Sequence, residues 1–259
     1  MSFDISQHFD QYFSLKVANT EELLNEVYRI RYEVYCEELQ YESPENFSDG
    51  LEKDICDKHS INCLLQHKST GTYAGCVRLI LPPNKSFNST FPWKKFASSI
   101  TYPYSDYQWD NIGEISRLAV RSQFRKRKED GELPVGSTLP SNSNRRRFPL
   151  ITMSLYWAAA CLALNSNLDL FAIMQPRLAR HLQKCGLRYS LISDLFDFHG
   201  ERGIFLIKSS ELIENLEPNT YDFFCYINNI IVEGLPQLQY IRSPLDTKDF
   251  ESLNKLVQT

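Results

Sequence analysis

The spacing of apolar residues near the start of the chain predicts a long helix. Asn19 followed by Glu22 has the spacing of a helix N-terminal cap, so we expect the helix to run from Asn19 to Leu39. Its apolar residues recur every three or four positions, at Leu23, Val27, Ile30 and Val34. A helix with one apolar stripe of this kind buries that stripe against the rest of the protein.

Short apolar runs bounded by turn residues predict the strands. Residues 61–67 and 72–81 predict a β-hairpin, because a Lys-Ser-Thr-Gly turn separates them. Further strands are predicted at residues 112–120, 168–174, 187–192 and 204–208. Further helices are predicted at residues 150–164, 177–186, 210–215 and 221–232. This order of elements indicates a mixed α/β fold.

Two stretches rich in Pro, Ser and Asn interrupt this order. Residues 82–111 and 126–149 are therefore predicted to be irregular insertions. We expect one domain over residues 1–208, which contains both insertions. Residues 209–259 are predicted to form a helical C-terminal extension that packs back on the core through Phe223, Phe224 and Ile227.

The composition narrows the class of protein. With 259 residues, 42% of them hydrophobic, the chain can bury the core of one large or two small domains. Its seven cysteines include no Cys-x-x-Cys pair, which favours a reduced, cytoplasmic protein. No apolar stretch reaches the roughly 20 residues of a membrane span, so stable membrane insertion is not expected. The net charge of −4 conceals basic runs at 125–128 and 145–147, which favour an acidic partner, and no nucleic acid is expected.

Arg31 stands out among the charged residues because it emerges from the apolar stripe of the first helix. Its neighbours three and four positions away are Val27, Tyr28, Val34 and Tyr35. An unpaired charge in such surroundings is costly, so Arg31 must extend to solvent or find a carboxylate. The candidates are Asp54, Asp57 and Glu114.

Arg78, Glu114 and Arg117 lie within predicted strands. Glu114 and Arg117 point to opposite faces of a regular strand, and one β-bulge would bring them to the same face. A solvated ion pair on an edge strand contributes only ~0 to 1 kcal/mol, and that is the alternative for any one of these residues. Six charged residues in apolar surroundings together favour an assembled polar site, namely Arg31, Asp54, Asp57, Arg78, Glu114 and Arg117.

Two other kinds of chemistry have weaker support. Asp54, Asp57 and His59 have the residue types of a metal site, but pairing of the carboxylates with arginine is favoured, and no metal is expected. Cys36 and Cys76 lie in apolar elements, where buried, unreactive cysteine is the usual outcome.

Four motifs resemble those of a known family: Arg31-Tyr-Glu-Val-Tyr35, Asp54-Ile-Cys-Asp57, Gly75-Cys-Val-Arg78-Leu and Glu114-Ile-Ser-Arg117-Leu-Ala-Val. Their order and residues resemble the autoinducer synthases that make acyl-homoserine lactones, a branch of the GNAT-like N-acyltransferases. The resemblance is closer to the acyltransferases associated with PEP-CTERM/exosortase systems and to the N-acyl amino acid synthases. It extends to about Ile207 and includes Met174-Gln-Pro-Arg-Leu and His199-Gly-Glu-Arg202, which suggest substrate contacts for Tyr35, Met174, His199 and Arg202.

The resemblance implies a GNAT-like fold, in which a splayed mixed sheet flanked by helices admits the arm of a thioester donor between two parallel strands. It implies no tightly bound cofactor. The Gly-containing loop that grips coenzyme A pyrophosphate in this fold is replaced here by Gln123-Phe-Arg-Lys-Arg. A phosphopantetheine on an acidic acyl carrier protein needs less of a cradle and more basic surface, so we expect this donor, bound near Arg125, Lys126 and Arg127, with acyl-coenzyme A as the alternative.

The implied reaction is direct attack of an amine on the acyl thioester, without a covalent enzyme intermediate. Glu114 is the expected general base, and backbone N–H groups of Leu118, Ala119 and Val120 are expected to stabilise the oxyanion. The predicted function is fatty acylation of an amino acid or a related amine. The alternatives are a homoserine-lactone synthase, a coenzyme A-dependent N-acetyltransferase and a non-catalytic module that binds a carrier protein or lipid.

Overall fold

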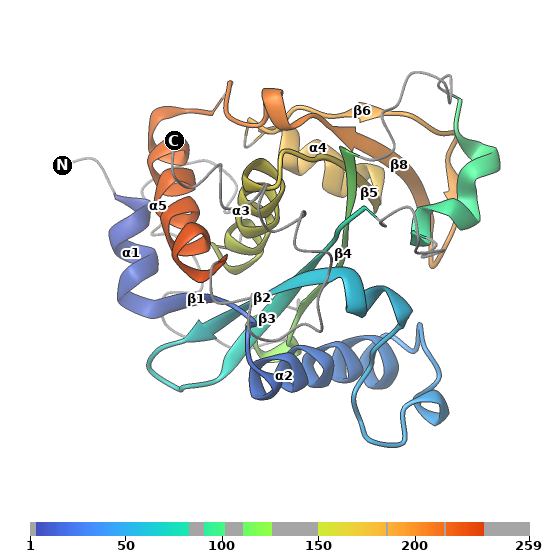
Figure 1. Ribbon diagram of the computed structural model, residues 1–259, viewed down its shortest axis with the longest axis horizontal. Coiled ribbons are helices and arrows are strands. Elements are labelled where there is room, and N and C mark those ends of the chain that lie inside the picture. Colours follow the sequence, from blue (N-terminus) through green and yellow to red (C-terminus); the bar gives the residue numbers. More distant parts are fainter. Residues whose placement is uncertain are drawn as a thin grey trace.

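One mixed sheet runs through the middle of the protein (Figure 1). The computed structural model describes residues 4–82, 91–101, 111–125, 150–184, 186–214 and 216–235. Within these ranges the strand order is β1-β2-β3-β4-β5-β8-β6, and β7 pairs with β8. The strands are β1 (Phe13–Val17), β2 (Ser60–His67), β3 (Tyr73–Ile80), β4 (Ile112–Val120), β5 (Asp169–Met174), β6 (Ser190–Leu191), β7 (Phe196–Asp197) and β8 (Glu201–Ile207).

The two central strands, β4 and β5, are parallel, whereas the other strand pairs are antiparallel. They pair from Ile112 opposite Asp169 as far as Ile115 opposite Ala172. Both strands continue beyond this point, to Val120 and Met174, without pairing to each other. The sheet is therefore splayed, and the predicted GNAT-like fold class is confirmed.

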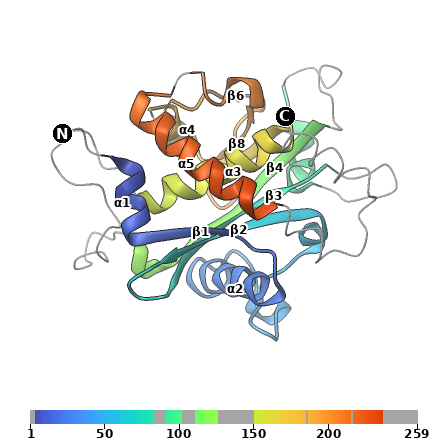
Figure 2. The ribbon, with the colours of Figure 1, turned by 60° about the vertical axis from the view of Figure 1, so that its left-hand side comes forward.

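Helices cover both faces of the sheet (Figures 1 and 2). Helix α2 (Glu21–Arg31) lies on one face, and α3 (Leu150–Asn165) with α5 (Pro218–Gly234) lies on the other. The remaining α-helices are α1 (Ile5–Tyr12) and α4 (Pro176–Lys184). A π-helical segment, Tyr32–Glu38, continues α2, and 3₁₀ turns occupy Pro44–Asn46, Ile55–His59, Pro92–Ser99, Ser122–Phe124 and Ser209–Glu211. No helix of the described ranges is long and apolar enough to span a bilayer.

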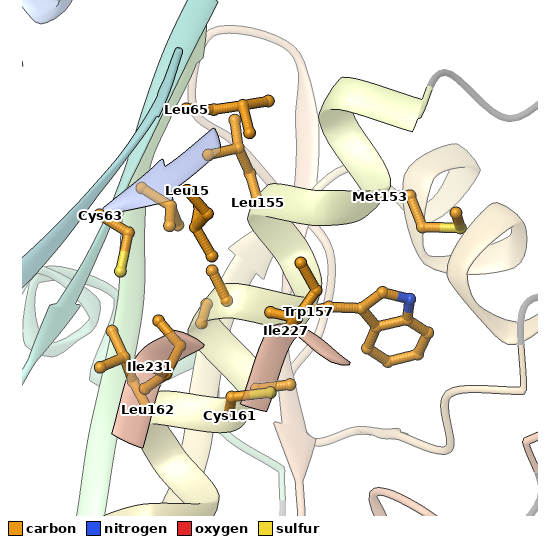
Figure 3. Close-up of a cluster of buried hydrophobic side chains, with 14 of the residues drawn as sticks. Leu15, Cys63, Leu65, Met153, Leu155, Trp157, Cys161, Leu162, Ile227 and Ile231 are labelled. Atoms are coloured by element: carbon orange, nitrogen blue, oxygen red, sulfur yellow. The ribbon is translucent and has the colours of Figure 1, made fainter. Parts of the chain in front are cut away.

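Helix α3 is the centre of the main core because nearly all of its surface is apolar. Figure 3 shows Trp157 and Leu162 of this helix among side chains from the sheet and from α5. The ring of Trp157 packs edge-on against Phe224 of α5, with 5.5 Å between centroids. Phe223, Phe224 and Ile227 are all buried, so the predicted packing of this helix on the core is confirmed. The boundary at residue 208 stays a prediction.

Several predicted elements differ from those observed. The N-cap of the first helix is Thr20 and not Asn19, because the Thr20 hydroxyl accepts a hydrogen bond from Leu23 N at 3.2 Å. The predicted strand at 187–192 is reduced to Ser190–Leu191, and the predicted helix at 210–215 is the 3₁₀ turn Ser209–Glu211. Helix α1 and strand β1 were not predicted. Residues 83–90, 102–110 and 126–149, which make up most of the predicted insertions, lie outside the described residues.

Candidate active site

Arg31 is fully buried and paired with two carboxylates. Its Nη1 lies 2.6 Å from Asp57 Oδ1, and its Nε donates to Glu52. Burial would lower the pKa of Arg31, but the charges of Asp57 and Glu52 outweigh that effect and raise it. Of the two predicted alternatives, extension to solvent and pairing with a carboxylate, the structure has the second. Asp57 was among the candidates and Glu52 was not, whereas Glu114 does not pair with Arg31.

Arg78 is also fully buried and binds the two aspartates of the loop before β2. Its Nη1 and Nη2 donate to the two oxygens of Asp54 at 2.7 and 3.1 Å, and Nη1 also lies 2.9 Å from Asp57 Oδ1. Burial would raise the pKa of Asp54, but Arg78 outweighs burial and lowers it to about 2. Both carboxylates therefore remain ionised and occupied by arginine.

The loop that carries these aspartates is held by its own hydrogen bonds. Asp54 Oδ1 accepts from Cys56 N at 2.8 Å, and Asp57 Oδ2 accepts from Asp54 N at 2.7 Å, which together cap the short turn Ile55–His59. This reciprocal capping fixes both side chains toward the arginines. Within the described ranges, no group of three or more His, Cys, Asp or Glu could hold a metal ion.

A β-bulge in β4 brings Arg117 into the same cluster. Cys76 pairs with Ala119 and Arg78 with Ser116, so β4 has one more residue than β3 in this interval. Arg117 takes up the extra residue with φ of 49°, which is uncommon for a side chain of its kind. Its Nη2 lies 2.8 Å from Glu42 Oε1 and 3.0 Å from Glu52 Oε1. The structure therefore has the bulge that the sequence permitted, and Glu52 links Arg31 to Arg117.

Tyr35 packs against this bulge. Its hydroxyl donates to the carbonyl oxygen of Leu118 at 2.8 Å, and the guanidinium carbon of Arg117 lies 5.3 Å from the centre of its ring. Burial raises the pKa of Tyr35 to about 12, so the hydroxyl is a donor at neutral pH. The contact secures the backbone of β4 at the position where β4 and β5 separate.

Glu114 is a buried carboxyl group on the paired part of β4, and its side chain is 1% exposed. Its Oε2 accepts a hydrogen bond from Trp93 N at 3.2 Å, and no ion pair of Glu114 occurs in the part of the chain that the structure describes. Burial raises the pKa of Glu114 to about 8, and the Trp93 hydrogen bond opposes this only in part. This is the environment in which a carboxyl group exchanges a proton near neutral pH.

Trp93 and the 3₁₀ turn Pro92–Ser99 close the space beside Glu114. The Trp93 ring is fully buried and packs edge-on against Phe171 of β5 at 5.2 Å between centroids. Because Phe171 lies opposite Glu114 in the parallel ladder, the tryptophan covers both central strands one pair before their last paired residues, Ile115 and Ala172. Sequence analysis assigned this segment to an insertion and gave it no part in the site.

The residues predicted for donor binding are only partly described. Leu118, Ala119 and Val120 lie on β4 beyond its last pairing with β5, at the edge of the splay. Arg125 donates to Glu38, and Lys126 and Arg127 lie outside the described residues. Arg121, at the end of β4, is likewise paired, with Glu33 and Glu26.

The separation of β4 from β5 divides the sheet into a first limb, β1 to β4, and a second limb, β5 to β8. Apart from Tyr35, the residues predicted for substrate contact lie on the second limb. Met174 is buried at the end of β5. His199 belongs to the β7–β8 turn and Arg202 to the start of β8, where Arg202 Nε donates to the Phe198 carbonyl oxygen at 2.6 Å. The imidazole of His199 stacks on Tyr41, with ring centroids 4.0 Å apart and an interplanar angle of 12°. Tyr41, like Glu42, Glu52 and Trp93, was missed, because these residues have no distinctive local pattern.

Two cysteines near the site have the expected environment. Cys36 and Cys76 are buried, and burial raises the pKa of Cys36 to about 11 and that of Cys76 to about 12. Both are therefore thiols at neutral pH and poor nucleophiles, as the sequence predicted.

Comparisons with known proteins agree with this geometry. Residues 30–131 match the family model of the GNAT acetyltransferase domain. The fold is similar to that of the acyl-homoserine-lactone synthase LasI, with 17% identity, a TM-score of 0.56 and coverage of 79% of this chain and 96% of LasI. BjaI, a coenzyme A-dependent acyl-homoserine lactone synthase, has 15% identity, a TM-score of 0.54 and coverage of 96% and 99%. No curated protein matches the chain.

A third solved structure with this fold is FeeM, an N-acyl amino acid synthase from uncultured soil microbes. It has 13% identity and a TM-score of 0.52, and the match covers 79% of this chain and 94% of FeeM. At these identities the likeness shows a shared fold, while the family match adds the GNAT domain over residues 30–131. The chain is therefore an enzyme, an acyltransferase of the GNAT type.

Proposed function

We propose that this enzyme transfers a fatty acyl group from acyl carrier protein to the amine of an amino acid or a related small molecule. The observation that carries the proposal is Glu114, a buried carboxyl group with a pKa near 8 beside the point where β4 and β5 separate. An amine must lose a proton to attack a thioester. A base is most effective when its pKa lies near the operating pH, and burial brings Glu114 into that range.

The reaction joins the amine nitrogen to the thioester carbonyl carbon. Glu114 takes the proton that leaves the nitrogen, directly or through one water, and the tetrahedral intermediate then expels the thiolate as the carbon–sulfur bond breaks. The thiolate gains a proton, so the products are an amide and a free thiol. No enzyme nucleophile is needed, which is consistent with the buried, protonated thiols of Cys36 and Cys76.

The end of β4–β5 pairing at Ile115 supports an oxyanion site on the backbone of β4 beyond that residue. This edge faces the space between the limbs, because β5 no longer pairs with it. We propose that N–H groups of Leu118, Ala119 and Val120 donate to the oxygen on which negative charge develops. The bulge at Arg117 and the hydrogen bond from Tyr35 to Leu118 O hold this backbone in place.

The arginine and carboxylate cluster supports the acceptor side of the proposed site. Arg31 and Arg78 are both fully buried and surrounded by carboxylates, so they act as scaffolding. Arg117 is different, because its side chain remains 21% exposed. We assign Arg117 as the group that pairs with an acceptor carboxylate, in competition with Glu42, whose side chain is 36% exposed.

The ion pairs after β4 argue against coenzyme A as the donor. Arg121 and Arg125 are already paired with glutamates, and Arg121 lines a hollow together with Glu33, Glu37 and Glu38. A pyrophosphate bound there would face carboxylates, and neither Arg121 nor Arg125 has a free guanidinium to bind it. A phosphopantetheine needs no such cradle, because the carrier protein brings its own contacts. Lys126 and Arg127, which lie outside the described residues, are retained from the sequence as basic residues expected to bind the carrier protein.

Three finer parts of the proposal concern the setting of the reaction. We place the enzyme in the cytoplasm, because Cys36, Cys56, Cys63, Cys76, Cys161 and Cys225 are all free thiols. We assign it to the branch associated with PEP-CTERM/exosortase systems, on the motifs around Arg31 and Glu114. We also retain the division into a domain over 1–208 and an extension over 209–259.

The test supplies the purified enzyme with long-chain acyl carrier protein or with acyl-coenzyme A, together with amino acids and homoserine-derived amines. Thiol release and mass spectrometry of the products report the reaction. An N-acyl amino acid made from the carrier protein donor supports the proposal. A homoserine lactone product, a preference for acyl-coenzyme A, or no amide with either donor would each contradict it.

A further inference from the structure

The opening between the two limbs of the sheet is crossed by a pair of stacked rings. Strand β8 pairs with β5 along its length, so that Gly203 lies opposite Met174, at the end where β5 has left β4. The turn before β8 carries His199 and therefore projects from the separated end of the second limb. Tyr41, on the first limb, meets it in the parallel stack with 4.0 Å between ring centroids.

Tyr41 is held to the first limb at the bulge. Its N–H donates to the carbonyl oxygen of Tyr35 at 2.8 Å, and the hydroxyl of Tyr35 binds Leu118 O. The rings of Tyr35 and Tyr41 are 6.5 Å apart, and Arg117 lies over Tyr35. A row of side chains thus leads from Arg117, beside the proposed oxyanion site, to His199 on the opposite limb.

The position of His199 is maintained at a conformational cost. Its φ is 54°, in the left-handed region that residues with a side chain seldom adopt. The turn is secured by Gly200 N, which donates to Asp197 Oδ1 at 3.1 Å, and by Phe198 N, which donates to Gly200 O at 3.0 Å. Strain of this kind, kept by local hydrogen bonds, is found most often at ligand clamps and active sites.

The stacked rings and Trp93 lie at opposite ends of the proposed acceptor space. Trp93 covers Glu114 where the limbs still pair, and Tyr41 with His199 bridges the limbs where they have separated. Between them lie Arg117 and Glu42, both partly exposed. In this arrangement an amine at Glu114 would have Arg117 on one side and the stacked pair of Tyr41 and His199 at its far side.

We propose that the stack of Tyr41 and His199 is the specificity wall of the acceptor site: it limits the size of the acceptor and packs against the part of it that is remote from the amine. This inference rests on the proposed function. It predicts that the favoured acceptors are amino acids whose side chains are apolar and short enough to fit in front of the rings. Removal of either ring should widen the acceptor site and weaken the binding of small acceptors.

The test compares Tyr41→Ala, His199→Ala and the double variant with the wild type and with Tyr221→Ala, a control that removes an exposed ring on α5. For a small acceptor we expect KM to rise by ~10-fold in each single variant, with KM for the acyl donor unchanged. The kcat/KM ratio of a bulky aromatic acceptor to a small one is expected to rise. Because the rings act as a pair, the double variant is expected to differ little from either single variant.

The outcomes separate this inference from the proposed function. Wild-type turnover with an acceptor preference that no ring variant changes would overturn the specificity wall and leave the acyltransfer proposal standing. Equal changes in the donor KM and the acceptor KM would also overturn the specificity wall and leave the acyltransfer proposal standing, because equal changes indicate a general loosening of the splayed sheet. No amide from the wild type with any donor would overturn both. Circular dichroism of each variant shows that a loss of turnover does not reflect unfolding.

Discussion

Replacement of Glu114 by glutamine is expected to stabilise the protein at alkaline pH while it abolishes acyl transfer. The glutamine keeps the size of the side chain and an oxygen that can accept from Trp93 N, but it cannot ionise. In the wild type, burial raises the pKa of Glu114 from 4.5 to about 8. The folded protein therefore holds a proton that the unfolded chain releases, and this proton must be lost as pH rises.

The raised pKa of Glu114 sets both the sign and the size of the change in unfolding free energy with pH. Stability attributable to Glu114 is fully present below about pH 4.5 and is lost as the pH rises toward the folded pKa of about 8. Each pH unit in this window costs about 1.4 kcal/mol. Between pH 6 and pH 9 the wild type should lose about 2 to 3 kcal/mol more stability than Glu114→Gln.

The assay is urea unfolding at pH 6, 7, 8 and 9 for the wild type, Glu114→Gln and Glu45→Gln, a control at an exposed glutamate. In parallel, thiol release from acyl carrier protein should fall by ~10²-fold to 10⁴-fold in Glu114→Gln, and its rate should lose the rise toward pH 8 that the wild type shows. Equal pH dependence of stability in wild type and Glu114→Gln would refute the reasoning. Retained transfer in a folded Glu114→Gln would refute the assignment of the base.

The other predictions concern the cluster and the sheet. Glu52→Gln leaves Arg31 short of a buried partner and should reduce the unfolding free energy by ~3 kcal/mol in urea, whereas Arg29→Gln, at a side chain that is 53% exposed, should change it by less than ~0.5 kcal/mol. Asp54 has its pKa lowered to about 2, so its stabilisation is present above about pH 3.8 and is lost as pH falls toward 2. Between pH 4 and pH 2 the unfolding free energy of Asp54→Asn should therefore fall by ~2 kcal/mol less than that of the wild type. An equal fall in the two proteins, measured by urea unfolding across this pH range, would contradict the pairing of Asp54 with arginine. Gly75→Ala places a Cβ 2.5 Å from the carbonyl oxygen of Ala119 and should lower the thermal midpoint by several degrees, so an unchanged midpoint would show that β3 and β4 can separate there without cost.

Much of the sheet could be predicted from the sequence because apolar periodicity is local. The observed β4 has the predicted bounds, Ile112–Val120, whereas β2 and β5 differ from prediction by one residue at one end and β3 by one residue at each end. The bulge at Arg117 was permitted by the sequence but not required by it, because Glu114 and Arg117 lie on opposite faces of a regular strand and only a shared site would need an irregular one. The short β6 and the missed α1 depend on neighbours that the local pattern does not contain.

The site was predictable in part for the same reason. The position of Arg31 on an apolar stripe requires a buried carboxylate, and Asp57 fulfils that requirement. Glu52 lies in a charged loop whose local sequence resembles solvated surface, yet it is 1% exposed and binds both Arg31 and Arg117. Its burial follows from the packing of that loop between α2 and β4.

The sequence by itself determined most of the longer helices and central strands and the charged residues that cannot remain buried and unpaired, because these follow from side-chain spacing and the cost of burying charge. The tertiary structure decided which carboxylate meets which arginine, how Trp93 desolvates Glu114, and where Tyr41 meets His199. Each of these contacts joins segments that are distant in the chain. Such contacts are set by the packing of the whole core, because ion pairing, desolvation and ring stacking act over a few ångströms in space regardless of separation in sequence.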